Sequence, residues 1–151
     1  MSNTKKILAV ASAGGHWVQL LRMAPAFDAC ECVYMSTKES FRKIVPNNTF
    51  YTINDFNRNN ISRIFGIVLQ IVEIIKKEKP KVIITTGAAP GLIALFIGKL
   101  FFKKTVWVDS IANVEELSMS GKIASYFADR VYTQWEHLAN KKIHFAGNVI
   151  I

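Results

Sequence analysis

The sequence predicts an α/β domain with a Rossmann-like, doubly wound parallel sheet of six or seven strands and helices on both faces. Three observations lead to this class. Short apolar runs of strand length alternate with longer stretches of helical periodicity along the 151 residues. Two of these runs end in glycine-containing turns that lead into a helix. No repeat, low-complexity tract or linker interrupts the alternation, so we expect a single domain over residues 1–151.

The stretch that organises the chain comes first. An apolar run of buried-strand length, Ile7–Ala11, is broken by four small residues, and helical spacing follows over His16–Met23. The four small residues are Ser12, Ala13, Gly14 and Gly15. The pattern predicts a strand, a glycine turn and a helix.

The first helix has an apolar side and a polar side. We expect Val18 and Leu21 to face the core, with Leu20 as a further candidate, because apolar residues three apart share a helix face. Gln19 and Arg22 are expected to face solvent.

The remaining elements follow in order. Further strands are expected over Cys30–Ser36, Phe50–Ile53, Val82–Thr86, Thr105–Val108, Arg130–Thr133 and Ile143–Phe145. Further helices are expected over Lys38–Val45, Ile61–Lys79, Leu92–Phe102 and Ser118–Phe127, with Thr37 as the N-cap of the first of these and a loop over Asn54–Asn60. Ligands of such sheets bind at the carboxyl ends of the strands, where both glycine turns and Asp109 fall.

The amino-acid composition restricts the kinds of partner that we expect. Lys and Arg outnumber Asp and Glu by 19 to 11, so the net charge of +8 favours an anionic partner: a phosphorylated ligand, a nucleic acid or an anionic membrane surface. Cys30 and Cys32 are expected to be free thiols on opposite faces of one strand, in a reducing compartment. The first strand follows the N-terminus so closely that we expect no signal peptide. The apolar run Ile64–Ile75 has 12 residues, too few to span a membrane.

Several site classes are excluded by their missing motifs. The first turn lacks the G-x-G-x-x-G pattern, and the second strand ends at Met35-Ser36-Thr37 with no acid to hold a ribose, which argues against a nicotinamide or flavin site. The chain has no Walker-type phosphate loop and no G-x-S-x-G elbow. The three histidines lack metal-ligand spacing, so we expect no metal site.

The glycine turns point to phosphate. A turn of this kind lets backbone N–H groups approach an anion at the positive end of a helix, and the second turn follows the strand over Val82–Thr86. A tight turn without any ligand is the alternative. The candidate phosphate- or acceptor-binding residues are Ser12, Ala13, Gly14, Gly15, Gly87, Ala88, Ala89 and Gly91.

Both turns also resemble those of a known enzyme class. The segment Ser12–His16 looks like the glycine loop that opens the acceptor domain of GT-B glycosyltransferases acting on lipid-pyrophosphate sugars, including the peptidoglycan enzyme that makes lipid II. The segment Thr86–Gly91 is similar to the second glycine loop of that class.

Later segments narrow the resemblance. They are Val108–Val114, Leu117–Lys122, Ala128–Val131 and Gln134-Trp135. Together they resemble the family of the membrane-recruiting, acceptor-side subunit of the split dolichol-linked N-acetylglucosaminyltransferase, and more closely its bacterial relatives in capsule and exopolysaccharide assembly. The match runs from Lys5 to Val149, with Asp109 standing where relatives commonly carry Glu.

The resemblance implies a function. A GT-B enzyme needs two domains with a cleft between them, and 151 residues supply one of these, the N-terminal, acceptor-side domain. We therefore expect one subunit of a two-chain inverting glycosyltransferase that adds a sugar from a UDP-sugar to a polyprenyl-pyrophosphate-linked sugar. The chain itself is expected to hold no cofactor, because the UDP-sugar would bind mainly to a separate donor-binding chain. The expected location is cytoplasmic, peripheral on the inner face of the cell membrane.

The resemblance also suggests roles for single residues. His16 is a candidate base for the acceptor hydroxyl, or a hydrogen-bond donor to a phosphate oxygen, or a capping residue. Asp109 is a candidate for orienting the acceptor, for the base itself, or for a loop cap. Ser110 and Lys122 are candidate phosphate ligands, although such a lysine is often merely solvated. Trp17 and Trp135 either line the cleft, dock the partner or pack in the core.

The helix after the second turn is apolar nearly all round and ends in lysines. This pattern favours contact with an anionic membrane, and burial of the helix in the core is the alternative. The candidate membrane-contact residues are Phe96, Lys99, Phe101, Phe102, Lys103 and Lys104. The rival functions are a phosphate-binding or scaffolding domain without transferase activity, and a nucleic-acid binder. Only the net charge suggests the last, and we expect no nucleic-acid partner because no recognised binding motif is present.

Overall fold

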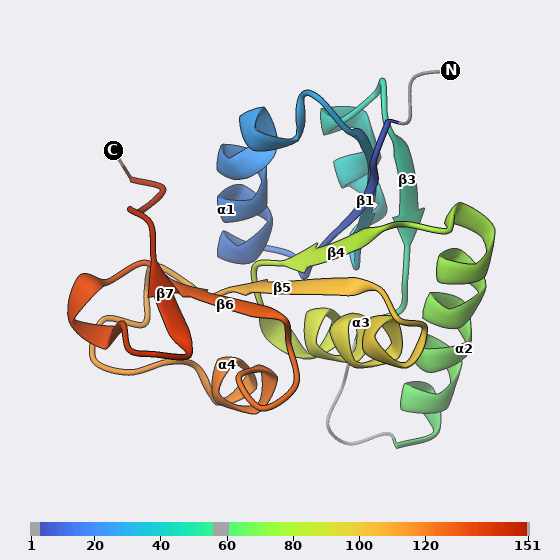
Figure 1. The fold of residues 1–151 in the computed structure, drawn as a ribbon. Coiled ribbons are helices and arrows are strands. Elements are labelled where there is room, and N and C mark those ends of the chain that lie inside the picture. The colour runs from blue at the N-terminus through green and yellow to red at the C-terminus, as the bar shows by residue number, and fades with distance from the viewer. Residues whose placement is uncertain (1–3, 56–60, 151) are drawn as a thin grey trace.

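The computed structural model describes residues 4–55 and 61–150. These residues form a seven-stranded sheet in the order β3-β2-β1-β4-β5-β6-β7, with every neighbouring pair parallel (Figure 1). The strands are β1 (Lys6–Ala11), β2 (Glu31–Ser36), β3 (Thr49–Thr52), β4 (Val82–Thr85), β5 (Lys104–Val108), β6 (Arg130–Thr133) and β7 (Ile143–Phe145). The predicted class and all seven predicted strands are confirmed, with shifts of one residue at some ends.

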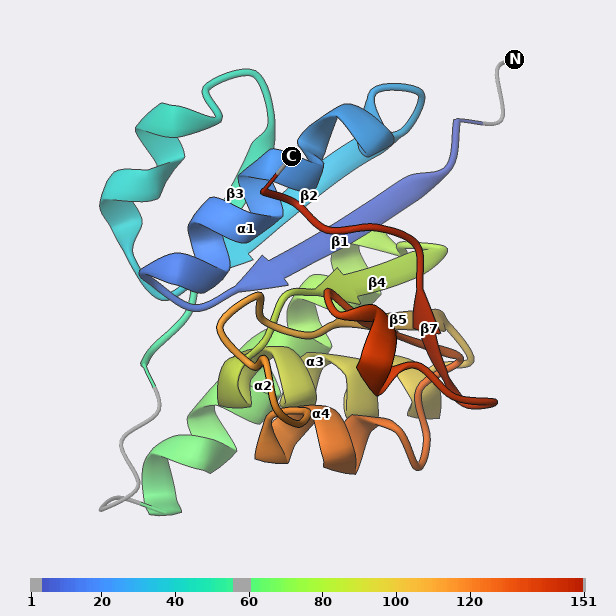
Figure 2. The ribbon, with the colours of Figure 1, turned by 90° about the vertical axis from the view of Figure 1, so that its left-hand side faces the viewer.

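The helices divide between the two faces of the sheet. They are α1 (Gly15–Met23), α2 (Ile61–Glu78), α3 (Ala88–Leu100) and α4 (Met119–Ala124), with short 3-10 helices η1 (Ala24–Phe27), η2 (Glu39–Ile44) and η3 (Glu136–Leu138). Helices α2, α3 and α4 pack on one face and α1 on the other (Figure 2). No helix among the described residues is long and apolar enough to cross a lipid bilayer.

Each face has its own apolar core, as expected for a parallel sheet. Under α2, α3 and α4 the cluster includes Leu8, Ile71, Leu95 and Trp107, all fully buried. Beneath α1 lies a second cluster with an aromatic centre, where Trp17 stacks on Phe41 and meets Tyr34 and Phe50 edge-on.

The first helix turns a different side to the core from the one predicted. Trp17 and Leu20 are buried, whereas Val18 is 51% exposed and Gln19 only 3% exposed. The prediction for Val18 and Gln19 was therefore wrong, because the large indole of Trp17 anchors the helix and sets its rotation. Leu21 is half-buried and Arg22 is exposed, as expected.

Other local predictions also need correction. The segment expected as an α-helix over Lys38–Val45 is the 3-10 helix η2, and Thr37 does not cap it: its Oγ1 accepts a hydrogen bond from the Ala13 N–H at 3.3 Å. Cys30 and Cys32 are free thiols, yet both pack in the same cluster, since residues two apart in a strand share a face. The expected loop Asn54–Asn60 lies outside the described residues from position 56 onward.

Helix α3 begins four residues earlier than predicted, at Ala88. Pro90 is tolerated there because the first turn of a helix has no backbone acceptor for its missing N–H. As a result Ala89, Pro90 and Gly91 belong to the first turn of the helix and not to a loop. Helix α4 is shorter than predicted and begins at Met119, where the Ser118 hydroxyl accepts a hydrogen bond from the Gly121 N–H.

Candidate functional site at the carboxyl edge of the sheet

The carboxyl ends of β1 and β4 are the natural binding position of this fold. These two strands are neighbours, but α1 leaves β1 toward one face and α3 leaves β4 toward the other. Each helix follows a glycine with positive φ, Gly14 at 82° and Gly87 at 135°. Neither N-terminus is capped by a side chain of the described residues. The first turns of both helices therefore present backbone N–H groups at this edge.

The first turn is open. Ala13, Gly14 and Gly15 are exposed and Ser12 is half-buried. A Cβ atom added to Gly14 or Gly15 would meet no described atom within 4 Å. The absence of side chains here leaves room for a ligand to approach the backbone.

The second turn is packed against the protein. A Cβ atom on Gly87 would lie 2.5 Å from the His16 ring, and one on Gly91 would lie 2.0 Å from the Thr85 hydroxyl. Ala88 adopts a φ of 66°, which is unusual for a residue with a side chain. Ala88 and Ala89 are half-buried, whereas Gly91 is buried against the Thr85 side chain.

His16 joins the two turns. Its Nδ1 lies 2.8 Å from the Thr86 carbonyl oxygen, and the Thr86 hydroxyl donates to the His16 carbonyl at 2.6 Å. Because a carbonyl only accepts, Nδ1 must carry the proton, which leaves Nε2 of the neutral ring as an acceptor. The half-buried ring is thus held in one orientation, with a basic nitrogen available.

Asp109, at the end of β5, is 2% exposed and fully hydrogen-bonded. Its Oδ1 accepts from the Trp107 indole at 2.9 Å and the Ser118 hydroxyl at 2.6 Å. Its Oδ2 accepts from the Asn113 amide at 3.0 Å and the Ser118 N–H at 2.9 Å. This carboxylate closes the loop between β5 and α4, an arrangement that favours an orienting role over that of a base.

Gln19 was missed by the sequence analysis as a site residue. Its amide nitrogen donates to the Asp109 carbonyl at 3.0 Å, and its Oε1 accepts from the Ile111 N–H at 3.1 Å. The Trp135 indole donates to the Ile111 carbonyl at 2.9 Å, so this tryptophan braces the same loop. The available signal was a glutamine close to Trp17 on the same helix. It was missed because the sequence analysis assigned the wrong side of α1 to the core.

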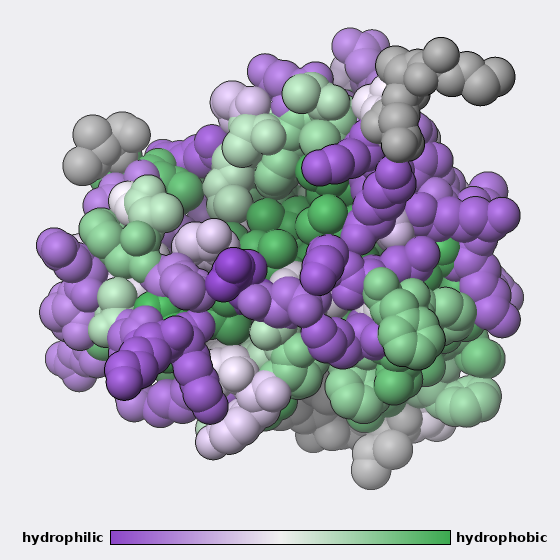
Figure 3. All heavy atoms as spheres, viewed as in Figure 1, coloured by the Kyte–Doolittle hydropathy of each residue, from purple (hydrophilic) through white to green (hydrophobic). Residues whose placement is uncertain are grey.

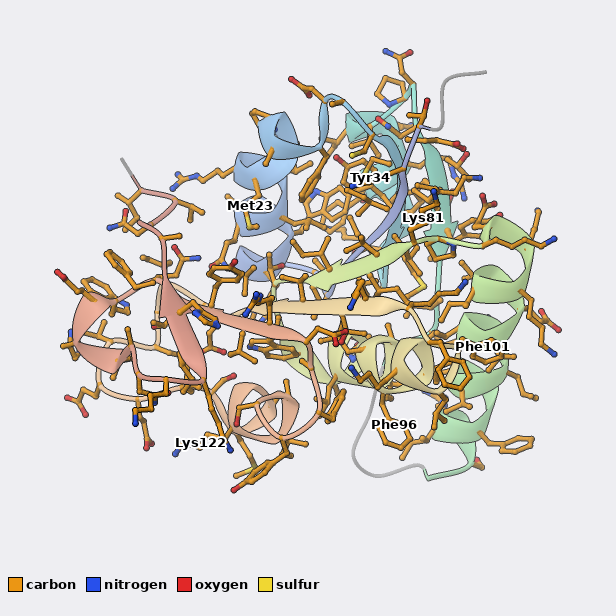
Figure 4. The ribbon with its side chains drawn as sticks, in the orientation of Figure 1. Met23, Tyr34, Lys81, Phe96, Phe101 and Lys122 are labelled. Carbon is orange, nitrogen blue, oxygen red and sulfur yellow. The ribbon has the colours of Figure 1, made fainter. Side chains whose placement is uncertain are left out.

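The structure separates the remaining candidates. Ser110 lies in the loop after β5, where its hydroxyl accepts from the Ala112 N–H at 3.2 Å. Lys122 lies in the last turn of α4, not at its start, and its Nζ is 2.6 Å from Glu116 (Figure 4). Trp17 belongs to the core, with an indole nitrogen that has no partner among the described residues. His16 and the first turn thus form the centre of the site, and Asp109 and Gln19 support it.

Comparison with known proteins identifies the family. Residues 50–149 match the protein family described as "Oligosaccharide biosynthesis protein Alg14 like". The chain belongs to the Alg14-like family. Among curated relatives it is similar to "UDP-N-acetylglucosamine transferase subunit ALG14" of Homo sapiens, at 31% identity over 180 residues, covering 95% of this chain and 82% of the relative. The protein of the same name from Yarrowia lipolytica is 26% identical, with 90% and 76% covered.

Solved structures share the fold. MurG of Acinetobacter baumannii superposes with a TM-score of 0.77 at 14% identity, covering 94% of this chain and 45% of that one. UDP-N-acetylglucosamine 2-epimerase of Rickettsia bellii gives 0.74 at 12% identity, with 98% and 46% covered. The Alg14-like chain therefore spans less than half the length of these two proteins and has the fold of a GT-B half-domain.

The expected membrane-contact residues of this Alg14-like chain split into two groups. Phe96 is 53% and Phe102 97% exposed, whereas Phe101 and Lys103 are half-buried and Phe101 packs against the core (Figure 4). Further exposed apolar residues lie on the helices of the same face, namely Phe65, Leu69, Leu100, Met119 and Ile123, and Tyr126 follows in the turn after α4. The sequence analysis singled out one helix, but the exposed apolar surface extends to three.

The lysines near this surface are not equivalent. Lys99 Nζ lies 2.6 Å from Asp129 Oδ1. Burial alone would raise the pKa of Asp129, but hydrogen bonds from Lys99 and Thr105 outweigh it and lower the pKa below the ordinary value. Lys104 is exposed and begins β5, and it lines a small hollow together with Lys99, Phe102, Lys103 and Asp129. Within residues 4–55 and 61–150, no three His, Cys, Asp or Glu side chains cluster as metal ligands would.

Proposed function

We propose that this Alg14-like protein is the acceptor-binding, membrane-associating subunit of a two-chain inverting glycosyltransferase. The enzyme transfers a sugar from a UDP-sugar to a polyprenyl-pyrophosphate-linked sugar in polysaccharide biosynthesis. The observation that carries the proposal is the meeting of the two glycine turns. There, two uncapped helix N-termini and an oriented His16 meet at the carboxyl edge of the sheet.

The division into two chains has two supports. Relatives of similar length, of which this chain covers 82% and 76%, are named as subunits of a UDP-N-acetylglucosamine transferase. Solved structures with the same fold are about twice as long, and this chain covers 45% and 46% of two of them. We assign the donor-binding half to a separate chain that faces the two glycine turns.

The acceptor pyrophosphate binds at the first turn in this proposal. Its oxygens accept hydrogen bonds from the N–H groups around Gly14 and Gly15, where a phosphate meets no side chain. The second turn supplies the opposite wall through Ala88 and Ala89. Ser110 borders the site from the loop after β5. Lys122 takes no part, because Glu116 already pairs with it.

His16 is the base of the proposed reaction. The acceptor hydroxyl oxygen attacks the anomeric carbon of the donor sugar, the bond from that carbon to the UDP oxygen breaks, and UDP leaves with the electron pair. The hydroxyl proton passes to His16 Nε2, which is left without a proton in the neutral ring because Nδ1–H donates to the Thr86 carbonyl. Asp109 and Gln19 act as positioning residues that hold the loop beside the acceptor.

Membrane association completes the proposal. Phe102 is almost fully exposed, and its φ of 57° is that of the left-handed residue that ends helix α3, where the Lys103 N–H donates to the Gly98 carbonyl at 2.9 Å. Together with Phe96 and Leu100 it forms an apolar surface beside the basic residues Lys99 and Lys103. We propose that this surface rests on anionic lipid at the cytoplasmic face of a bacterial cell membrane, where capsule or exopolysaccharide is assembled.

A turnover assay tests the two-chain proposal. The purified chain is incubated with UDP-N-acetylglucosamine and a short polyprenyl-pyrophosphate sugar, alone and with the candidate donor-binding chain from the same genome. We expect little or no product from the chain alone and full turnover with both chains. Full turnover by the lone chain would contradict the proposal, and acceptor binding without turnover in either mixture would favour a phosphate-binding scaffold.

Liposome flotation tests the membrane surface. The wild-type chain should float with anionic liposomes at low salt, and Phe96→Asp with Phe102→Asp should abolish flotation. Val18→Asp is the matched control, because Val18 is also exposed but lies on α1, on the other face of the sheet. Equal flotation of the double variant and the control would exclude this surface as the membrane contact.

A further inference from the structure

Lysines are concentrated at the amino edge of the sheet. Four strands have a lysine at their start: Lys6 begins β1, Lys81 precedes β4, Lys104 begins β5 and Lys142 precedes β7. In Figure 3 hydrophilic side chains gather at the upper right, where β1 and β4 begin. The two glycine turns lie at the opposite, carboxyl edge. A pyrophosphate bound at these turns is therefore at the other end of the strands from these lysines.

A pyrophosphate needs more positive charge than one helix N-terminus supplies. The first turn of α1 offers backbone N–H groups and the equivalent of about half a positive charge. A pyrophosphate bridge between a lipid and a sugar has two charged phosphate groups, whereas a monophosphate bridge has one. A cationic side chain beside the first turn would stabilise the additional charge.

Lys38 stands beside the first turn. Thr37, the residue before it, accepts a hydrogen bond through Oγ1 from the Ala13 N–H at 3.3 Å. Lys38 is exposed, and its Nζ lies 5.5 Å from the centre of the Phe41 ring. The Phe41 ring in turn stacks on Trp17 of α1, with ring centres 4.8 Å apart. These contacts connect Lys38 to the turn on one side and to the beginning of α1 on the other.

No carboxylate of residues 4–55 and 61–150 forms an ion pair with Lys38. The adjacent acid, Glu39, lies 2.5 Å from Arg42 and also accepts a hydrogen bond from the Thr52 hydroxyl. Hydrogen bonds from Arg42 and Thr52 lower the pKa of Glu39 to about 2, so at neutral pH its carboxylate stays charged and bound to these partners. The Lys38 ammonium group is therefore available to a ligand.

A buried hydroxyl at the same place lacks a hydrogen-bond partner among the described residues. Ser36 ends β2 and is fully buried, and its Oγ is the atom concerned. In the register of the sheet it lies beside Ala11, which ends β1 just before the first turn. Strand alternation puts Ser36 on the face of Cys32 and Tyr34, which pack under α1. Buried hydroxyls are normally hydrogen-bonded, so this end of the turn favours a ligand with acceptor oxygens.

We infer that Lys38 binds the second phosphate of the acceptor and makes the site selective for a pyrophosphate-linked sugar over a monophosphate-linked one. One phosphate accepts hydrogen bonds from the N–H groups of the first turn, and the other meets Lys38 Nζ. The ammonium group leaves the Phe41 ring, because an exposed cation–π contact is weaker than a charge-assisted hydrogen bond to phosphate. The Thr37 hydroxyl, an acceptor toward Ala13, still has its own proton to donate to a phosphate oxygen. The inference rests on the proposed function, since it concerns the acceptor of that reaction.

Two matched ligands test the inference. The same sugar is linked to a short prenyl chain through a pyrophosphate or through a monophosphate, and calorimetry measures the affinity of the purified chain for each. We expect wild type to bind the pyrophosphate-linked ligand about tenfold more tightly. Lys38→Ala should lose this preference while its affinity for the monophosphate-linked ligand stays unchanged. Lys38→Arg, which keeps the charge, should retain the preference.

Turnover of the two-chain enzyme gives a second measurement. Lys38→Ala should raise the KM for the pyrophosphate-linked acceptor about tenfold and leave the KM for the UDP-sugar unchanged. Lys43→Ala is the matched control, because Lys43 is also exposed and lies in η2, and it should behave like wild type in both measurements. Circular dichroism and thermal melting verify that each variant is folded.

The outcomes separate this inference from the proposed function. If wild type binds both ligands equally, or if Lys38→Ala weakens both equally or neither, the inference is wrong while acceptor binding at the first turn stands. If Lys38→Ala raises the KM for the UDP-sugar instead, Lys38 serves the donor and the inference is again wrong. If wild type binds neither ligand and the two chains together give no turnover, the proposed function itself fails.

Discussion

The two glycine turns end neighbouring strands and begin helices in the same way, yet their glycines serve different purposes. At Gly14 and Gly15 a side chain would enter open space. At Gly87 and Gly91 it would collide with His16 and Thr85. The first turn therefore has the geometry for a ligand to approach the backbone, and the second has the geometry for two parts of the protein to approach each other. The comparison shows that a glycine motif can indicate either situation, and that only its neighbours decide which.

The largest effect is expected where the two turns meet. His16→Ala should lower the turnover of the two-chain enzyme by about 10²-fold or more, because it removes the base. Stability should change little, because the ring is half-buried. The measurement is the steady-state rate beside a urea denaturation curve, with His137→Ala, an exposed histidine, as control. An unchanged rate would remove His16 from proton transfer and leave it the role of joining the turns.

Within the packed turn, a single methyl group should be costly. Gly91→Ala places a Cβ 2.0 Å from the Thr85 hydroxyl, so we expect a loss of about 1–3 kcal/mol in the free energy of unfolding. The matched change in the open turn is Gly15→Ala, at the first residue of α1, which should preserve stability or raise it by up to about 1 kcal/mol. Urea denaturation of both variants gives the comparison. Equal free energies of unfolding would mean that the two turns do not differ.

For the open turn, a large side chain should affect binding but not folding. Gly15→Trp should raise the KM for the lipid-linked acceptor about tenfold, which corresponds to roughly 1.4 kcal/mol, because the indole occupies the position of the phosphate. Its melting temperature should match that of wild type. A normal KM in a folded Gly15→Trp variant would show that the acceptor does not lie at this turn.

The smallest effect is expected at Asp129, which lies in neither glycine turn and therefore serves as a reference for both. The pKa of Asp129 is lowered in the folded state, so its contribution is complete above its ordinary value of 3.8 and is lost as the pH falls through the folded pKa. In Asp129→Asn, the free energy of unfolding should fall less steeply than in wild type as the pH drops below about 4. The difference should be less than about 1 kcal/mol, because Asp129 is partly exposed. Turnover at neutral pH should not change. Denaturation curves from pH 2 to 6 measure the slope, and an unaltered slope would contradict this role.

Strand positions could be predicted from the sequence because buried strands of a parallel sheet are short, apolar and bounded by polar or small residues. The ends of β6 and β7 agree with the prediction to the residue. The rotation of α1 could not be predicted in the same way. The apolar spacing of Val18 and Leu21 is outweighed by the indole of Trp17, whose aromatic partners Phe41 and Phe50 lie far along the chain.

The two glycine turns could be predicted from the sequence, but the contacts around them only in part. The turns were predicted because small residues between a strand and a helix leave a local signal. The burial of Asp109 and Gln19 depends on hydrogen bonds between residues up to 92 positions apart, and no local pattern encodes them. The open and packed characters of the turns likewise depend on Thr85 and on the His16 ring, which sequence spacing does not place.

The central claim is that the two glycine turns bind the acceptor pyrophosphate at the carboxyl edge of the sheet. An NMR titration of the lone chain tests this claim most directly. Amide signals of ¹⁵N-labelled protein are followed while a short-chain polyprenyl-pyrophosphate sugar is added. The account predicts saturable shifts at residues 13–16 and 87–89, competition by inorganic pyrophosphate, and loss of both in Gly15→Trp. Shifts confined to α4 around Lys122, or no saturable shifts at these two turns, would contradict it.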